Sequence, residues 1–308
     1  MAEPMKIAYV FPGQGSQWVG MGRDLYQGFA PAKAVFEQAD EALGFSLSRL
    51  CFEGSEDELL QTINAQPAIV AVSFACLEAM RGVNGIAPAA FVAGHSLGEY
   101  TALAAAGVLD FAKTVYLARE RGRLMHEAGQ KVPGGMAAII GLDEPALAEV
   151  CARSGARIAN INCPGQIVIS GAEDNLTRAM EMAKAKGAAR VIRLQVSGAF
   201  HTPLMQPAVD GMGKIIAELS FSPPDVPIIG NTTAQPITTA EMVKYELLRQ
   251  LCNCVQWQRS IEYMLGDGVS TFVEIGPGRV LAGLIKRIDR NVNIVNIGDA
   301  EAVKKYKG

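Results

Sequence analysis

A serine lies between two glycines in segment 94–98, Gly-His-Ser-Leu-Gly, and this spacing suits nucleophilic catalysis. The apolar run 89–92 predicts a short buried strand before it, and the Ala- and Leu-rich run 97–108 predicts a helix after it. A sharp strand-to-helix turn of this kind, a nucleophile elbow, exposes the serine hydroxyl. Glycines avoid a clash across so tight a turn, and the helix directs backbone N–H groups toward the serine. The pattern therefore predicts Ser96 as a nucleophile.

An activated serine needs a general base, and the chain has 3 histidines. His95 adjoins the serine, so we expect its side chain to line the substrate site rather than to reach the hydroxyl. His126 falls on a polar helical face, where a solvated role is expected. His201 follows a predicted strand and precedes a predicted helix, where open α/β sheets carry catalytic residues. Elimination predicts His201 as the base; the alternative is a buried structural histidine.

The third member of a catalytic triad is not evident in the sequence. No aspartate between Ser96 and His201 lies on an obvious strand-end loop, because Asp143 and Asp174 have the positions of helix caps. A backbone carbonyl, or no third member, is expected instead.

Arg121 is the other informative residue. At helical spacing it is the sole charge on an apolar stripe of the helix predicted from Asp110 to about residue 128. A buried guanidinium needs an anion, and its planar fork suits a carboxylate. The alternative is a structural ion pair with an internal Asp or Glu. Together, Ser96, His201 and Arg121 predict transfer of an acyl group that carries a carboxylate.

A glycine-rich turn, Gly-Gln-Gly-Ser at 13–16, follows the predicted strand 6–11. It lacks the full spacing of a dinucleotide fingerprint. At the mouth of a sheet this turn places the backbone N–H of Gln14 near the elbow. Gln14 and Leu97 are therefore the predicted oxyanion donors.

Composition limits the classes of function. The chain has 308 residues, 49% of them apolar and 19% charged, as in a folded globular protein of one large domain or two. Its net charge of −3 argues against a nucleic-acid partner. The start lacks the pattern of a signal peptide, and the longest uncharged stretch, 59–77, contains several polar residues, so no membrane span is expected. The 6 cysteines lack metal-ligand spacing, so we expect no metal and a reducing cytoplasm.

The order of predicted elements divides the chain into two parts. Residues 130–196 predict the order β-α-β-β-α-β, the split βαβ unit of a ferredoxin-like subdomain. This unit is inserted into a larger α/β-hydrolase-like domain, 1–129 and 197–308, in which short apolar strands alternate with helices. Such alternation predicts a parallel sheet covered by helices on both faces.

Several motifs resemble those of the malonyl-CoA:acyl-carrier-protein transacylases of fatty-acid synthesis. The acyltransferase domains of polyketide and animal fatty-acid synthases are more distantly similar. The resemblance covers essentially the whole chain and is carried by segments 11–17, 94–100, 121–122, 160–166, 198–201 and 255–257. Cys163 and Cys254 depart from it, because serine and proline are common at those positions, which leaves the local loop shape open.

The resemblance implies a Ser96–His201 dyad in which the backbone carbonyl of Gln256 orients the histidine. It also implies a preference for malonyl over methylmalonyl groups, because Leu97 and Phe200 are the malonyl-type residues. Methylmalonyl-type domains tend to carry Gln and Ser there, and Phe200 would fill the space of an α-methyl group.

The expected reaction is ping-pong transfer of malonyl from malonyl-CoA to the phosphopantetheine thiol of acyl carrier protein, through a malonyl-serine intermediate. The expected substrate-binding residues are Arg121, Gln14, His95, Phe200 and Asn162. No cofactor is expected, the partners are malonyl-CoA and the carrier protein, and the protein is expected to be a monomer. A serine esterase or thioesterase and a non-enzymatic carrier-protein-binding module are the alternatives. The sequence leaves fatty-acid and polyketide pathways both open.

Overall fold

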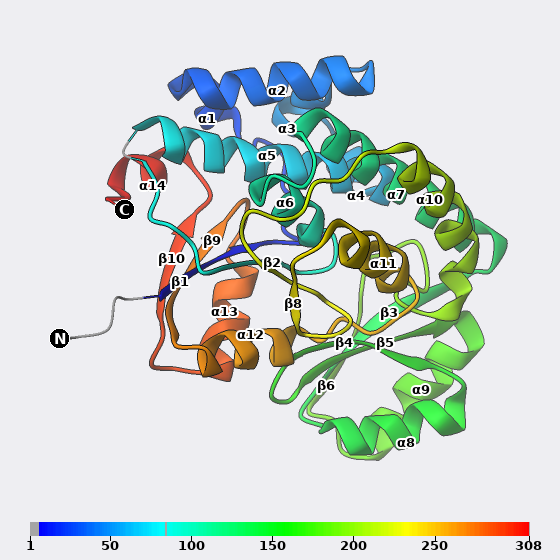
Figure 1. Cartoon of the computed structure of the whole chain (residues 1–308). Helices are drawn as coiled ribbons and strands as arrows, with labels where there is room; N and C mark the ends of the chain where they lie inside the picture. Colours follow the sequence, from blue (N-terminus) through cyan, green and yellow to red (C-terminus); the bar gives the residue numbers. More distant parts are fainter. Residues whose placement is uncertain (1–5, 84, 308) are drawn as a thin grey trace.

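The computed structural model describes residues 6–83 and 85–307, and within them the strands form two sheets (Figure 1). The larger sheet has the order β10-β9-β1-β2-β7-β8. Its first five strands run parallel, and β8 pairs antiparallel with β7. The strands are β1 (Lys6–Phe11), β2 (Phe91–Gly94), β7 (Ile228–Ile229), β8 (Pro236–Ile237), β9 (Val269–Ile275) and β10 (Asn293–Ile297).

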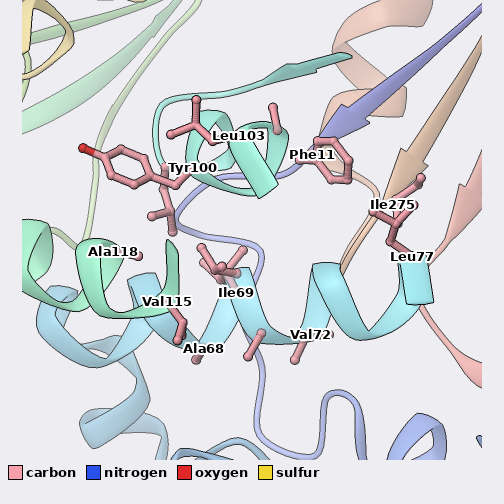
Figure 2. Packing of buried hydrophobic residues seen from close by; sticks show 14 of the residues in the cluster. Phe11, Ala68, Ile69, Val72, Leu77, Tyr100, Leu103, Val115, Ala118 and Ile275 are labelled. Carbon is pink, nitrogen blue, oxygen red and sulfur yellow. The ribbon is translucent and has the colours of Figure 1, made fainter. Parts of the chain in front are cut away.

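Helices cover both faces of this sheet, as the sequence predicted. Alternate side chains of β1 point to opposite faces, because a strand has a period of two residues. Tyr9 and Phe11 pack in the core that contains the long central helix, whereas Ala8 and Val10 pack with the helices behind the sheet. Figure 2 shows Phe11 together with residues of three helices on the first face, α5 (Thr62–Val83), α6 (Gly98–Ala105) and α7 (Phe111–Lys131). The helices on the other face are α12 (Trp257–Gly266) and α13 (Val280–Ile288).

Helix α5 is long and apolar enough to cross a membrane by length and composition, but 78% of its most apolar window is buried inside the protein. The sequence predicts a helix at 67–80, but α5 begins five residues earlier, at Thr62, and passes through Pro67. Proline has no N–H to donate to the carbonyl of Ile63. Arg119 Nη1 donates to that carbonyl instead, at 2.8 Å, which explains how the helix tolerates a proline in its second turn.

The second sheet is antiparallel, with the order β4-β5-β3-β6. Two helices cover one of its faces, and residues on the other face, including Met136 and Val168, join the main core. The sequence predicts the last strand at 189–196, but the strand ends at Arg193, and Leu194 and Val196 line a cavity. The elements are β3 (Gly134–Ile140), α8 (Glu144–Ser154), β4 (Arg157–Cys163), β5 (Gln166–Ala172), α9 (Glu173–Ala185) and β6 (Arg190–Arg193).

A backbone contact joins the two parts of the structure. Val255 N donates to Ala159 O at 2.8 Å, and Ile161 N donates to Val255 O at 2.9 Å, so β4 is held next to the start of α12. Helix α11 (Ala240–Gln250) ends just before this contact. The remaining helices are α1 (Arg23–Gly28), α2 (Ala30–Leu43), α3 (Leu47–Glu53), α4 (Glu56–Leu60), α10 (Gln206–Glu218) and α14 (Ala300–Lys305), with a 3-10 turn η1 (Pro203–Met205).

Candidate active site

Ser96 occupies the predicted sharp turn between β2, which ends at Gly94, and α6, which begins at Gly98. Its φ of 50° lies in the left-handed region, which is uncommon for a non-glycine residue. A Cβ at Gly94 would lie 1.9 Å from the carbonyl carbon of Gly98, and a Cβ at Gly98 would lie 2.1 Å from Phe11 O. The structure confirms the elbow and the need for both glycines.

His201 lies next to the serine. The distance from Ser96 Oγ to His201 Nε2 is 2.8 Å, and His201 Nδ1 lies 2.8 Å from the backbone carbonyl of Gln250. A carbonyl only accepts hydrogen bonds, so Nδ1 carries the proton and Nε2 is left as an acceptor facing the hydroxyl. His201 also has a left-handed φ, 59°, which shows how tightly this loop is held.

The prediction that Gln256 orients His201 is wrong. The carbonyl of Gln256 instead accepts from Ser260 N at 2.9 Å and from Ser260 Oγ at 3.1 Å, within the first turn of α12. Gln250 takes the orienting position because it is the last residue of α11, and the final carbonyls of a helix have no partner within the helix.

Burial, reinforced by the nearby charge of Arg121, lowers the pKa of His201 from its usual value to about 3. Both effects disfavour the imidazolium form. The ring is therefore neutral, and able to accept a proton, throughout the physiological range.

We expect kcat/KM for the acyl donor to stay flat from about pH 8 to about pH 5, because this parameter reports the free enzyme. The direction of the pH dependence follows from the lowered pKa of His201. Protonation of the imidazole removes the base, and with a lowered pKa this protonation occurs only in more acidic solution. The measurement is the initial rate of acyl transfer at low substrate concentration across this range. A loss of activity with an apparent pKa of about 6.5, the ordinary value for histidine, would contradict it.

Arg121 is buried, as its place on the apolar stripe predicted, with 1% of its surface exposed. It donates to the side-chain carbonyls of Gln66 at 2.7 Å and Gln250 at 2.8 Å, and Nη2 lies 3.1 Å from Ser96 Oγ. Within the described part of the chain it forms no ion pair with an Asp or Glu, and its Nε has no hydrogen-bond partner. The alternative of a structural ion pair is therefore wrong, and the guanidinium lies beside the nucleophile.

Two buried side chains that the sequence analysis missed hold the elbow. Asn231 Oδ1 accepts from Ser96 N at 2.7 Å, and Asn231 Nδ2 donates to Gly94 O at 2.7 Å. The carboxylate of Glu99 accepts from Asn231 N and from Gln250 Nε2. Burial raises the pKa of Glu99 well above its usual value. Nothing in the local sequence marks these residues, because their partners lie far away in the chain.

A cavity of about 180 Å³ opens beside Ser96, between the two sheets. His95 lines it and its Nε2 lies 2.9 Å from Asn162 Oδ1, so this imidazole is turned to a partner other than the serine, as predicted. Burial lowers the pKa of His95. The five residues predicted to bind the substrate all line the cavity: Arg121, Gln14, His95, Phe200 and Asn162.

The turn at 13–16 lies against the elbow. A Cβ on Gly13 would lie 2.3 Å from His95 O, so only glycine permits this approach. The backbone N–H groups of Gln14 and Leu97 donate to no group in the parts of the chain that the structure describes, whereas Ser96 N is used by Asn231. Both N–H groups are therefore free to bind an oxyanion, and that role stays a prediction.

The other candidate residues lie elsewhere. His126 is partly exposed on α7, with Nε2 at 3.0 Å from the side-chain amide nitrogen of Gln130, so it is not part of the cavity. The 6 cysteines are free, and the described residues contain no group of three or more His, Cys, Asp and Glu that could hold a metal.

Comparison with known proteins gives consistent results over nearly the whole chain. The acyl transferase domain family matches residues 8–307. Malonyl CoA-acyl carrier protein transacylase of Bacillus subtilis is 45% identical, covering 97% of this chain and 95% of the relative, and that of Escherichia coli K12 is 44% identical, covering 92% and 93%.

Solved structures agree with the sequence comparisons. Acyl-carrier-protein-S-malonyltransferase from Bartonella henselae superposes with a TM-score of 0.94 at 43% identity, covering 97% of this chain and 98% of the other. A malonyl-transacylase solved in complex with a type II PKS acyl-carrier protein gives 0.93 at 39% identity, covering 97% and 98%. With the serine elbow, the facing histidine and the buried arginine in place, this chain belongs to the acyl transferase domain family.

Proposed function

We propose that the protein transfers a malonyl group from malonyl-CoA to the phosphopantetheine thiol of acyl carrier protein, through a malonyl ester on Ser96. The observation that carries the proposal is the buried guanidinium of Arg121, which forms no ion pair with an Asp or Glu among residues 6–83 and 85–307 and lies 3.1 Å from the serine oxygen. An acyl donor with its own carboxylate would supply the anion that such a cation needs. The names of the relatives, malonyl CoA-acyl carrier protein transacylases, support the same reaction.

The first half-reaction follows from the Ser96–His201 contact. His201 Nε2 takes the hydroxyl proton while Oγ attacks the thioester carbonyl, and the oxyanion accepts from Gln14 N–H and Leu97 N–H. The carbon–sulfur bond then breaks, and His201 returns the proton to the departing CoA thiolate. In the second half-reaction the carrier-protein thiol gives its proton to His201 and attacks the ester. Ser96 is regenerated, and no metal or cofactor takes part.

Two side chains are proposed to select the acyl group. Arg121 binds the malonyl carboxylate through its two terminal nitrogens, a geometry that suits a planar anion. Phe200 is buried and lines the cavity, where its ring occupies the space that an α-methyl group requires. A clash of this size is worth about 1–3 kcal/mol, which makes malonyl preferred over methylmalonyl rather than exclusive.

We further propose that residues 130–196 are a ferredoxin-like subdomain inserted into an α/β-hydrolase-like domain formed by 1–129 and 197–308. Support comes from the βαββαβ element order and the sheet order β4-β5-β3-β6 for the first, and from the parallel strands and the serine elbow for the second. The chain is proposed to act as a monomer in the cytoplasm, where its free cysteines stay reduced.

The direct test of this function is a steady-state assay with malonyl-CoA and the phosphopantetheine-bearing carrier protein. Malonyl-carrier protein, measured by its intact mass, should accumulate in step with released CoA thiol. The matched control is Ser96→Ala, which should release neither product. Release of CoA with free malonate, at a rate that the carrier protein does not change, would identify a thioesterase instead.

A further inference from the structure

The turn at 13–16 is stabilised mostly by hydrogen bonds between residues of the turn and its next neighbour in the sequence. Ser16 Oγ donates to Gly13 O at 2.8 Å, and Gly15 N donates to the side-chain oxygen of Gln17 at 2.8 Å. Within the described chain, one side-chain hydrogen bond joins the turn to another element: Thr62 Oγ1, at the first residue of α5, donates to Gln14 Oε1 at 2.9 Å. The position of Gln14 relative to the elbow therefore depends on this hydroxyl.

Thr62 is also the middle of a hydrogen-bonded chain that starts at the buried arginine. Arg121 Nη1 donates to Gln66 Oε1 at 2.7 Å, Gln66 Nε2 donates to Thr62 Oγ1 at 2.9 Å, and the Thr62 hydroxyl donates to Gln14. Thr62 and Gln66 are 1% and 0% exposed, so bulk water has no access to replace a missing member.

The direction of every bond in this chain is fixed by its first member. An arginine has only donors, so Gln66 must present its oxygen to Arg121 and its nitrogen to Thr62. The threonine hydroxyl has a single proton, and after accepting from Gln66 it gives that proton to Gln14 Oε1. The amide of Gln14 is thereby oriented, and its Nε2 has no partner within the described parts of the chain although the side chain lines the cavity.

We propose that Thr62 is a positioning residue of the acyl-transfer site, and this rests on the proposed function. Its hydroxyl holds the Gln14 side chain and so fixes the turn that supplies one oxyanion N–H. Through Gln66 it also sets that turn relative to Arg121. The group at this position has to donate a hydrogen bond to Gln14 and accept one from Gln66, and a methyl group of the same size can do neither. Thr62 touches neither the nucleophile nor the base.

The test compares Thr62→Val, which keeps the shape of the side chain, with Thr62→Ser, which keeps the hydroxyl. Thr62→Val should lower kcat/KM for malonyl transfer by about 10-fold, the effect of one buried hydrogen bond lost at the reacting geometry. Thr62→Ser should stay within about 3-fold of the wild type by the same reasoning. A loss in Thr62→Ser as large as that in Thr62→Val would overturn the proposal.

A second readout does not depend on malonyl chemistry. An alkyl fluorophosphonate labels an activated serine: the Ser96 oxygen–phosphorus bond forms, fluoride leaves, and the serine proton passes to His201. Thr62→Val and Gln14→Ala should each slow this labelling. Because both act through one contact, the double variant should be no slower than Gln14→Ala alone.

The outcomes separate the two ideas. The protein could transfer no malonyl and still show slower labelling in both single variants, with the double variant no slower than Gln14→Ala. That result would refute the proposed function and leave the role of Thr62 standing. Labelling of Thr62→Val at the wild-type rate, or multiplicative slowing in the double variant, would overturn the role of Thr62 whatever acyl group is transferred. If Thr62→Val does not fold, Gln14→Ala decides: labelling of that variant at the wild-type rate overturns the proposal.

Discussion

Replacing His201 with alanine is expected to slow malonylation of Ser96 by about 10³-fold, within the range of about 10²–10⁴ for a positioned general base. The imidazole lies 2.8 Å from the serine oxygen, and its orientation is set by the Gln250 carbonyl. The measurement is the single-turnover rate of CoA release after rapid mixing of the enzyme with malonyl-CoA.

The matched control is His126→Ala, which removes a histidine on α7 that lies outside the cavity. Its rate should be within about twofold of the wild type, because substitutions on the surface and outside the site have small effects. Ser96→Ala should give no acylated protein. Equal rates for His201→Ala and the wild type would show that another group takes the serine proton.

Replacing Arg121 with alanine is expected to invert the acyl preference. Malonyl transfer should fall by about 10²–10³-fold, because two charge-assisted hydrogen bonds of about 1.5–3 kcal/mol are lost and bonds of this kind are only partly additive. The kcat/KM for transfer of an acetyl group should stay the same or increase, because an uncharged acyl group has no carboxylate for Arg121 to bind. The measurement is kcat/KM for malonyl-CoA and for acetyl-CoA.

Arg123→Ala is the control for this second substitution. Arg123 lies on the same helix, two residues away, and pairs on the surface with Glu120 and Glu127. Its removal should change neither substrate, because exposed ion pairs contribute about 0–1 kcal/mol. An equal loss on both substrates in Arg121→Ala would indicate that the arginine holds the structure together and does not bind the acyl group.

The parts of the site that the sequence predicts are those governed by local geometry. The elbow is visible because a tight turn requires glycine at two fixed positions around Ser96. Arg121 is recognisable because a helix repeats every 3.6 residues, and at this spacing Arg121 is the single charged residue on an apolar face. His201 follows by elimination, since the chain has only 3 histidines.

The contacts that complete the site were beyond the sequence because they join distant residues. Gln250 Nε2 donates to Ser96 O across 154 positions, and Asn231 Oδ1 reaches Ser96 N across 135. Buried Gln and Asn carry no periodic signal, so hydrophobic patterns do not reveal which amide meets which backbone group. The placement of Gln256 next to His201 failed for this reason: two glutamines six positions apart are indistinguishable until the end of α11 is fixed in space.

The fold shows the same division. The capping predictions hold in part. Asp143 caps α8, because its side chain accepts from Ala146 N, but Asp174 is not a cap, because α9 already begins at Glu173. Strand lengths at the sheet edge are less well predicted. The sequence predicts a strand at 226–230, but β7 spans only Ile228–Ile229 and pairs with β8, which the sequence did not predict. Edge pairing depends on neighbouring chain segments more than on the residues of the strand itself.

The most direct measurement is the fate of the covalent intermediate. The protein is mixed with malonyl-CoA, separated from free nucleotide, and divided between buffer and phosphopantetheine-bearing carrier protein, and the intact mass and the modified peptide are then followed over time. A malonyl group located on Ser96, stable in buffer and passed to the carrier-protein thiol on mixing, is the expected result. No adduct on Ser96, or an adduct that water removes as fast as the carrier protein does, would contradict malonyl transfer through this serine.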